Sequence, residues 1–170
     1  SINWVGPFAI DMSYCETSGT AFDGDGMVEM NFANQIVDVE LVANYLSLVG
    51  EPLVQFTAGE NVDYTFLYNT GTDEYYTHIW IDLNNNGVFE NNTEKVFTGV
   101  ALAESPTTLN TSFTIPNTGN SVTGEYRIRI ATADSAQSTP SPCYAGSYSH
   151  IFDFKATVTF PCNQPSNINF

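Results

Sequence analysis

Basic residues are scarce in this sequence. Only four of its 170 residues are Lys or Arg, against 19 Asp or Glu, so the formal net charge at pH 7 is −15. Nucleic acids and anionic membrane surfaces are bound through clustered Lys and Arg, and a field of this sign repels both. We therefore expect no nucleic-acid partner, whereas divalent cations are attracted. The same acidity also keeps an exported protein soluble without any binding site.

Long apolar runs are absent as well. No stretch of about 18 apolar residues is present, which predicts no transmembrane helix and no membrane insertion. The sequence starts at Ser1 without the charged and then apolar stretch of a signal peptide. We expect a mature or excised piece of a larger protein.

The signatures of common catalytic sites are missing. The two histidines, His78 and His150, do not accompany a Gly-x-Ser-x-Gly motif, and neither His-Glu-x-x-His nor Cys-x-x-Cys occurs. Carboxylates are numerous, so a glycosidase-like pair remains an alternative, although nothing singles out one pair. We expect no enzymatic activity and ordinary strand positions for both histidines.

Cysteine is limited to Cys15, Cys143 and Cys162. Three cysteines suit an oxidising compartment, with one pair bonded and one thiol left over, which predicts a secreted or cell-surface protein. We favour a Cys15–Cys143 disulfide because it would tie the first strand region to the last hairpin. A Cys143–Cys162 bond and three free, buried thiols are the alternatives.

Alternation of apolar and polar residues dominates the rest of the sequence. Phe152, Phe154, Ala156, Val158 and Phe160 occupy every second position, which predicts a long half-buried strand. No segment shows a helical stripe. We predict an all-β fold, an antiparallel two-sheet β-sandwich of jelly-roll or immunoglobulin-like type, with a β-barrel as the alternative. The other expected strands are 27–33, 38–48, 53–57, 62–68, 77–83, 95–102, 109–115 and 126–131.

The sequence favours a single domain over residues 1–160. A chain that is 42% hydrophobic buries a sizeable core, and no internal linker is apparent. The strand pattern ends after Phe160, and residues 161–170 contain two prolines. We interpret 161–170 as a linker to a following domain, and the Cys-x-x-Pro spacing at Cys162 resembles the opening of a fibronectin type III domain.

The most informative motif follows the strand expected at 77–83. Asp82, Asn84 and Asn86 recur at every second position, so their side-chain oxygens can converge, and Gly87 permits a sharp bend. Calcium takes six to eight oxygen ligands of this kind. The predicted calcium ligands are Asp82, Asn84, Asn86, the carbonyl of Val88 and Glu94.

This motif is not an EF-hand. Its twelfth loop position, where an EF-hand has its closing carboxylate, is Thr93, and Glu94 lies one residue further on. No helical pattern flanks the loop. An Asn-Gly hairpin turn without metal is the alternative. A second tract, Asp23-Gly24-Asp25-Gly26, is either another cation site or, as we favour, a turn.

Two loops carry pairs of tyrosines. Tyr75 and Tyr76 precede the calcium motif, and Tyr144 and Tyr148 follow Cys143. Tyrosine offers an apolar face and a polar tip at low entropic cost, which suits recognition of an extracellular polysaccharide or surface polymer. We expect a non-catalytic, calcium-stabilised binding module. The alternative is a structural spacer that contacts other domains of the same chain.

The order of several motifs resembles the GEVED domain family over about residues 13–160. The motifs are Trp80-Ile81-Asp82-x-Asn84-x-Asn86-Gly87-x-Phe89, Glu94-Lys95-Val96, Phe113-Thr114-Ile115-Pro116, Gly124-x-Tyr126-Arg127-Ile128-Arg129 and Pro142-Cys143, followed by a terminal strand. The resemblance implies a β-sandwich accessory module of exported multidomain proteins of the Bacteroidota, often attached to peptidases, glycoside hydrolases or adhesins.

The chain departs from the family at the motif that gives the family its name. Where the family has Gly-Glu-Val-Glu-Asp-Tyr, this sequence has Ser149-His150-Ile151-Phe152-Asp153-Phe154, so both glutamates are replaced. Any ligand role of those glutamates does not carry over, which leaves Asp153 as the one candidate. Alternation places Asp153 opposite the phenylalanine face, where a solvated carboxylate is the alternative.

Overall fold

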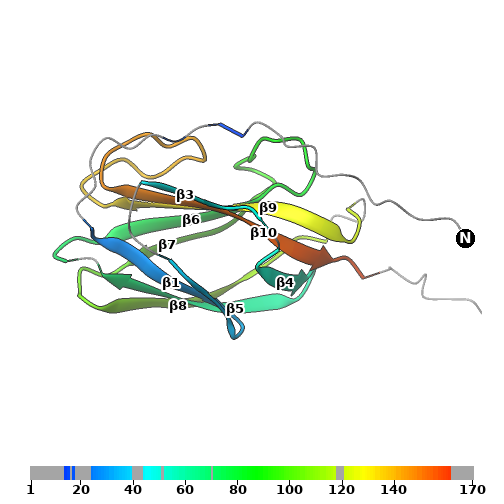
Figure 1. Cartoon of the computed structure of the whole chain (residues 1–170), viewed down its shortest axis with the longest axis horizontal. Coiled ribbons are helices and arrows are strands. Elements are labelled where there is room, and N and C mark those ends of the chain that lie inside the picture. Colours follow the sequence, from blue (N-terminus) through cyan, green and yellow to red (C-terminus); the bar gives the residue numbers. More distant parts are fainter. Residues whose placement is uncertain are drawn as a thin grey trace, which may run out of the picture.

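The computed structural model describes residues 14, 15, 17, 24–39, 44–50, 52–69, 71–117 and 121–161. They form two β-sheets packed face to face (Figure 1). No helix in this part of the chain is long and apolar enough to cross a membrane. The strands are β1 (Gly26–Phe32), β2 (Gln35–Asp38), β3 (Tyr45–Leu48), β4 (Val54–Thr57), β5 (Asn61–Asn69), β6 (Tyr75–Ile81), β7 (Lys95–Ala101), β8 (Thr107–Thr114), β9 (Gly124–Asp134) and β10 (Ser149–Thr159).

The two sheets confirm the predicted sandwich. One sheet has four antiparallel strands in the order β2-β1-β5-β8. The other has six strands in the order β3-β10-β9-β6-β7, with β4 also pairing with β10. Short strands β3 and β4 follow one another along the same edge of β10 and run parallel to it, whereas the remaining pairs in this sheet are antiparallel.

The core lies between the sheets and is rich in aromatic rings. Phe32 occupies its centre, with the rings of Phe56, Phe66 and Phe154 at centroid distances of 5.3–5.8 Å. The inward positions of β10 are those that the alternation predicted, because Phe152, Phe154, Ala156 and Val158 are all buried. These rings and the aliphatic side chains around them bury the apolar surface that stabilises the fold.

The strand expected at 38–48 is wrong in its extent. Gln35–Asp38 pairs with β1 in one sheet, and Tyr45–Leu48 pairs with β10 in the other. The chain therefore crosses from one sheet to the other between these strands. The alternating pattern does not reveal the crossing because no Gly or Pro interrupts residues 38–48.

The six-stranded sheet is also covered on its outer face. The loops that follow β6 and β9 lie over this face (Figure 1), and a second buried cluster is found there. Because both faces of the sheet are covered, β9 and β10 are buried at almost every position. The cluster consists of Trp80, Phe89, Ala131, Ala133, Tyr144 and Ile151, with Tyr14 packed against it.

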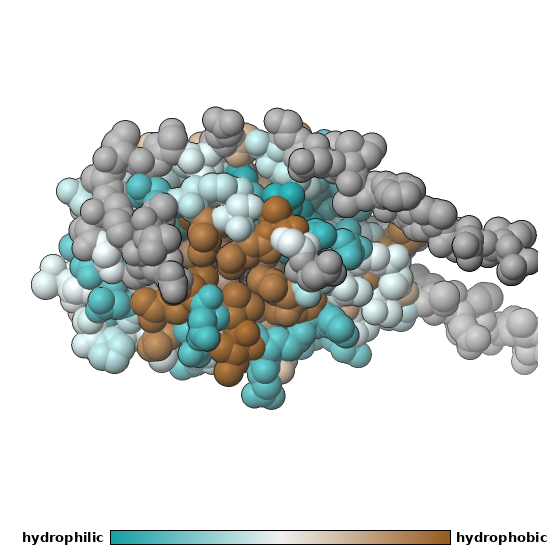
Figure 2. All heavy atoms as spheres, viewed as in Figure 1, coloured by the Kyte–Doolittle hydropathy of each residue, from teal (hydrophilic) through white to brown (hydrophobic). Residues whose placement is uncertain are grey.

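One side of the sandwich leaves apolar side chains partly open to solvent. Figure 2 shows them gathered in the middle of the face in view. In the edge strands, Ile36 of β2 is exposed and Leu46 of β3 is half-buried. The side chain of Gln35 bridges the sheets, since its Oε1 accepts from the Gln55 N–H at 2.6 Å and its Nε2 donates to the Gln55 carbonyl at 3.0 Å.

A candidate metal loop and the ion cluster beside it

The loop between β6 and β7 is organised around the carboxylate of Asp82, the first residue after β6. Its Oδ1 accepts from the Asn86 N–H at 3.1 Å. Its Oδ2 accepts from the Gly87 N–H at 2.9 Å and from the hydroxyl of Tyr14 at 2.6 Å. Asp82 is fully buried. The left-handed backbone of Gly87, with φ of 81°, turns the loop back around this carboxylate.

Glu94 closes the loop from its other end. Its Oε1 accepts from the Leu83 N–H at 2.8 Å, and its Oε2 accepts from the Glu90 N–H at 3.0 Å. Its backbone carbonyl also accepts from the Ile81 N–H at 3.0 Å, which joins the end of β6 to the start of β7. The Glu94 side chain is therefore held at the base of the loop, and the residue is only 2% exposed.

The two predicted asparagine ligands face a carboxylate that the sequence did not single out. The side-chain amides of Asn84 and Asn86 donate to Glu90 at 3.3 and 2.7 Å. Their Oδ1 atoms accept from the N–H groups of Asn86 and Val88 at 3.0 and 2.8 Å. Both asparagines are exposed, as is Val88. Five side chains with oxygen atoms thus lie together in one short loop, namely those of Asp82, Asn84, Asn86, Glu90 and Glu94.

The buried negative charge of this loop has no basic partner among the described residues. Asp82 and Glu94 are both buried, and neither forms an ion pair with a residue in the described part of the chain. Burial, with smaller contributions from the hydrogen bond with Glu90 and the charge of Asp82, raises the pKa of the Glu94 carboxyl to about 8. Hydrogen bonds from Glu94 and the asparagines lower the pKa of Glu90. Buried carboxylates without a counter-charge are costly.

This donor set fits a hard cation, because all its groups are oxygens and its buried charge is negative. Within the described residues, no three His, Cys, Asp or Glu side chains form a metal site by themselves. A cation in this loop would therefore depend on the amide oxygens of Asn84 and Asn86 and the carbonyl of Val88 as well as on Asp82 and Glu94.

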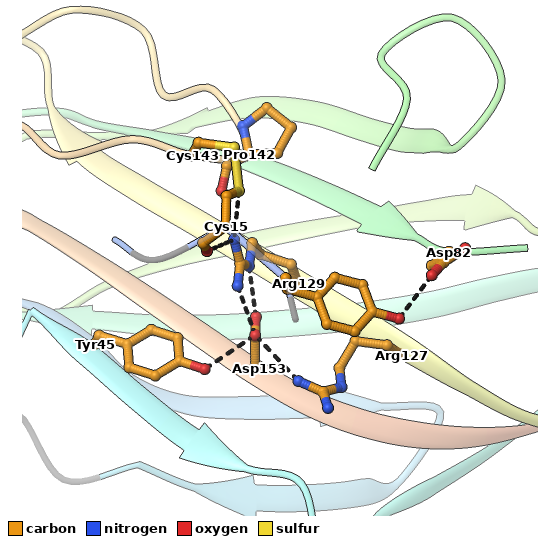
Figure 3. Close-up of polar contacts among 9 residues, drawn as sticks. Cys15, Tyr45, Asp82, Arg127, Arg129, Pro142, Cys143 and Asp153 are labelled. Carbon is orange, nitrogen blue, oxygen red and sulfur yellow. Dashed lines mark hydrogen bonds and ion pairs between the residues drawn. A yellow bond between two sulfur atoms is a disulfide. The ribbon is translucent and has the colours of Figure 1, made fainter. Parts of the chain in front are cut away.

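Beside the loop, Asp153 lies at the centre of a buried ion cluster (Figure 3). Its two oxygens accept from Nε and Nη2 of Arg129, each at 2.7 Å. Arg127 lies 3.3 Å from Oδ2, and the hydroxyl of Tyr45 donates to the same atom at 3.1 Å. Asp153 does face away from the phenylalanine side of β10, but it is completely buried, so it is not a solvated carboxylate.

Arg129 connects this cluster to the disulfide. Its Nη1 donates to the Pro142 carbonyl at 2.7 Å and to the Cys15 carbonyl at 3.0 Å. Its guanidinium also lies over the ring of Phe89, 5.1 Å from the centroid.

Cys15 and Cys143 are bonded, which confirms the favoured pairing and excludes a Cys143–Cys162 bond. Cys162 itself lies outside the described residues, as do residues 162–170 of the expected linker.

The four tyrosines do not form one exposed platform. Tyr75 belongs to the core between the sheets and is 1% exposed, and Tyr144 is buried in the outer cluster. Tyr76 is half-buried, and Tyr148 is 37% exposed. Successive side chains of β6 point to opposite faces of the sheet, and that of Tyr75 points into the core. Its ring is therefore not available to a ligand.

Both histidines are buried strand residues. The ring of His78 packs against that of Trp80 at 5.5 Å. Burial lowers the pKa of His78, and the charge of Lys95 lowers it further. His150 Nε2 lies 2.5 Å from the Asp25 carbonyl.

In the second acidic tract, Gly24 and Gly26 both have positive φ, which is consistent with the expected turn. Asp23 lies outside the described residues.

Five residues of this region were not predicted as site residues: Tyr14, Tyr45, Glu90, Arg127 and Arg129. The sequence carried a signal for two of them. Arg127 and Arg129 are half of all the basic residues, and they occupy alternate positions, hence one face, of an otherwise apolar strand. Two bases on one face of a largely buried strand indicate a buried acid as their partner. Tyr14, Tyr45 and Glu90 carry no comparable signal.

Comparison with protein families finds a match to the GEVED domain over residues 76–157. The match confirms the resemblance for a segment that includes the loop, both arginines, Cys143 and Asp153. GEVED is a family of accessory domains. Tyr14 and Cys15 lie outside the matched residues.

Comparison with curated proteins found no match. Among solved structures, one similar chain is the CARDB domain of a Pyrococcus furiosus protein, solved in complex with di-metal ions. It shares 13% sequence identity, and the alignment covers 87% of this chain and 100% of that chain with a TM-score of 0.38.

Proposed function

Because residues 76–157 belong to the GEVED domain family, we propose that this chain is a non-catalytic accessory module of a larger exported protein, with calcium bracing the loop after β6. The disulfide supports an oxidising, extracellular setting. The proposed calcium ligands are Asp82, Asn84, Asn86, the Val88 carbonyl and Glu94. The family resemblance supports a host protein from the Bacteroidota.

One observation carries the calcium proposal. Two buried carboxylates, Asp82 and Glu94, share a short loop without a positively charged partner in the described part of the chain. A divalent cation would supply the missing charge, and it would join the end of β6 to the start of β7. Burial is the main cause that raises the pKa of Glu94 to about 8, so proton uptake by this carboxyl competes with cation binding.

We propose a mechanical role first. A loop fixed by calcium at one end of the six-stranded sheet stiffens a module that connects other domains of the same chain. Stiffening needs no exposed ligand-binding platform, and two of the four candidate tyrosines are buried.

Recognition of an extracellular polysaccharide or surface polymer is the second candidate. Tyr76 on β6 lies opposite Ala133 on β9. On its other side, Ala133 lies opposite Ser149 on β10, the residue after Tyr148. The backbones of the two tyrosines are therefore only about two strand spacings apart, roughly 10 Å. This arrangement supports a small binding surface in which the rings of Tyr76 and Tyr148 contact the polymer together.

The test of the calcium proposal is a comparison of melting curves and calorimetric titrations. The domain is first stripped with excess chelator and then given millimolar calcium. A ligand at a hundredfold excess over its Kd stabilises the folded state by about 2.7 kcal/mol, so the melting temperature should rise by several degrees. Magnesium at the same concentration should act less, because it prefers fewer ligands and tighter geometry. Identical melting curves and no calorimetric heat would contradict the proposal.

A further inference from the structure

We propose that Tyr14 is a positioning residue for the cation loop, and that the Cys15–Cys143 disulfide holds Tyr14 in place. Calcium affinity would then depend on the redox state of a bond that contributes no ligand. This inference rests on the proposed calcium site.

Tyr14 fixes one oxygen of Asp82. Its hydroxyl donates to Oδ2 at 2.6 Å, the shortest of the three hydrogen bonds that this carboxylate accepts. Since Oδ2 also accepts from the Gly87 N–H, Tyr14 and the loop backbone together fix the orientation of the carboxylate. Oδ1 accepts only from the Asn86 N–H among the described residues, which leaves it more capacity for a cation.

Tyr14 is itself held from two sides. Its ring stacks on that of Phe89 in the loop, with centroids 5.0 Å apart and an angle of 29° between the planes. The guanidinium of Arg127, on β9, lies over the same ring at 4.6 Å from its centroid. Tyr14 therefore forms a bridge between the cation loop and the sheet. The charge-bearing neighbours of its ring are Asp82, Arg127 and Asp153.

The disulfide is the covalent anchor of this bridge. Neither Tyr14 nor Cys15 belongs to a strand, so no sheet ladder holds them. The segment is attached through the bond from Cys15 to Cys143, with Cα atoms 5.6 Å apart, and through the Arg129 side chain, which donates to carbonyls on both sides of the bond. Cleaving the bond would let residue 14 move away from Asp82.

Partners that orient a metal ligand commonly change metal affinity by about 10–100-fold when they are removed. Tyr14→Phe deletes the hydroxyl and keeps the ring. We expect calcium to bind this variant about tenfold more weakly in a calorimetric titration. Tyr45→Phe is the matched control, because Tyr45 also donates to a buried carboxylate of the same region, Asp153, but has no contact with Asp82. Its calcium Kd should equal that of the wild type.

A spectroscopic signature separates positioning from general loosening. Calcium binding changes the surroundings of the Tyr14 ring, so the titration should produce a tyrosine ultraviolet difference signal. Tyr14→Phe should lack most of this signal, and Tyr45→Phe should retain it. If both variants gave the wild-type signal and the wild-type Kd, Tyr14 would have no positioning role.

The role of the disulfide is tested by a double-mutant cycle. Replacing Cys15 and Cys143 together by Ser should weaken calcium binding about as much as Tyr14→Phe, and adding Tyr14→Phe to that variant should cause no further loss. Independent, additive losses would overturn the coupling. If the serine variant does not fold, the oxidised and reduced wild-type protein are compared instead, and equal affinities would overturn it. Failure of the wild type to bind calcium would refute the proposed function as well, whereas unchanged binding in all variants would refute only this inference.

Discussion

Arg129 and Asp153 form a two-pronged ion pair in which both N–O distances are 2.7 Å and neither side chain reaches solvent. The pair joins β9 to β10 at directly opposed positions, and Arg129 extends it to the carbonyls of Cys15 and Pro142. Since the guanidinium is fully engaged and the carboxylate accepts several donors, the pair meets the conditions under which a buried ion pair is tolerated. The pair stabilises the outer face of the six-stranded sheet, against which the disulfide and Tyr14 pack.

Arg129→Met should lower the free energy of unfolding by about 3–5 kcal/mol, because Arg127 is then the one charged partner that Asp153 keeps among the described residues. Urea unfolding measures the loss. Lys155→Met is the control, since Lys155 pairs with Glu125 on a solvent-exposed part of the same sheet, and it should cost less than about 1 kcal/mol. Equal losses for the two variants would show that burial of the pair has no special importance.

Removal of the disulfide by Cys15→Ser and Cys143→Ser should destabilise the domain by about 2–5 kcal/mol, because the bond closes a loop of 128 residues in the unfolded chain. The same urea unfolding experiment applies. Peptide mapping without reductant should recover Cys15 joined to Cys143, with Cys162 as the one alkylated cysteine. A peptide containing Cys162 in a disulfide within the monomer would contradict this pairing.

Asp82→Ala should abolish the rise in melting temperature that calcium produces, since it removes the carboxylate around which the loop turns. Asp73→Ala removes the same charge from an exposed turn and should leave the calcium effect intact. The comparison separates a local site from a general response of a protein with a net charge of −15. A calcium effect of the same size in both variants would favour the general response.

Acid should destabilise the domain through His78. Its pKa is lowered in the folded state from the usual 6.5, so the unfolded chain takes up the proton first. The contribution of neutral His78 to stability is therefore complete above pH 6.5 and is lost as the pH falls through the folded-state pKa. His78→Gln should flatten this part of the stability profile in urea unfolding at pH values from 7 down to about 5. A profile of unchanged slope would assign the acid sensitivity to other groups.

If the second candidate function holds, Tyr76→Ala and Tyr148→Ala should each weaken retention of the domain in affinity electrophoresis through soluble polysaccharides. Each stacked ring contributes on the order of 1 kcal/mol, about a fivefold change in affinity. Val122→Ala, at an exposed apolar position near the opposite end of β9, should leave retention unchanged. Absence of retention for the wild type across a broad panel would leave the mechanical role as the sole candidate.

The sequence predicted the parts of this fold that depend on local periodicity. Inward positions of β10, the sandwich class and the turn at Gly87 follow from alternation and from backbone geometry, which are properties of neighbouring residues. The outer cluster around Trp80 does not follow, because it is made by loops folding back over a sheet from distant parts of the chain. Asp153 shows the difference: its side of the strand was predicted correctly, but its burial depends on Tyr45, Arg129 and the disulfide region.

The candidate site shows the same limit. The spacing of Asp82, Asn84 and Asn86 located the loop, because its ligands are close in sequence. Tyr14 lies 68 residues before Asp82 and reaches it only through the fold, so no sequence spacing indicates the contact. The tyrosine pairs were judged by composition alone, and composition does not distinguish a ring that fills the core, as Tyr75 does, from one that faces solvent.

The bridge from Gln35 to Gln55 bears on how copies of this domain behave when crowded. Outer strands with free backbone groups invite pairing with neighbouring chains, which is a route to aggregation. Here the Gln35 side chain occupies both the N–H and the carbonyl of Gln55, as a neighbouring strand would. At Gln55, therefore, β4 offers no free backbone group to a neighbouring copy, which makes strand pairing between crowded copies less favourable at this position.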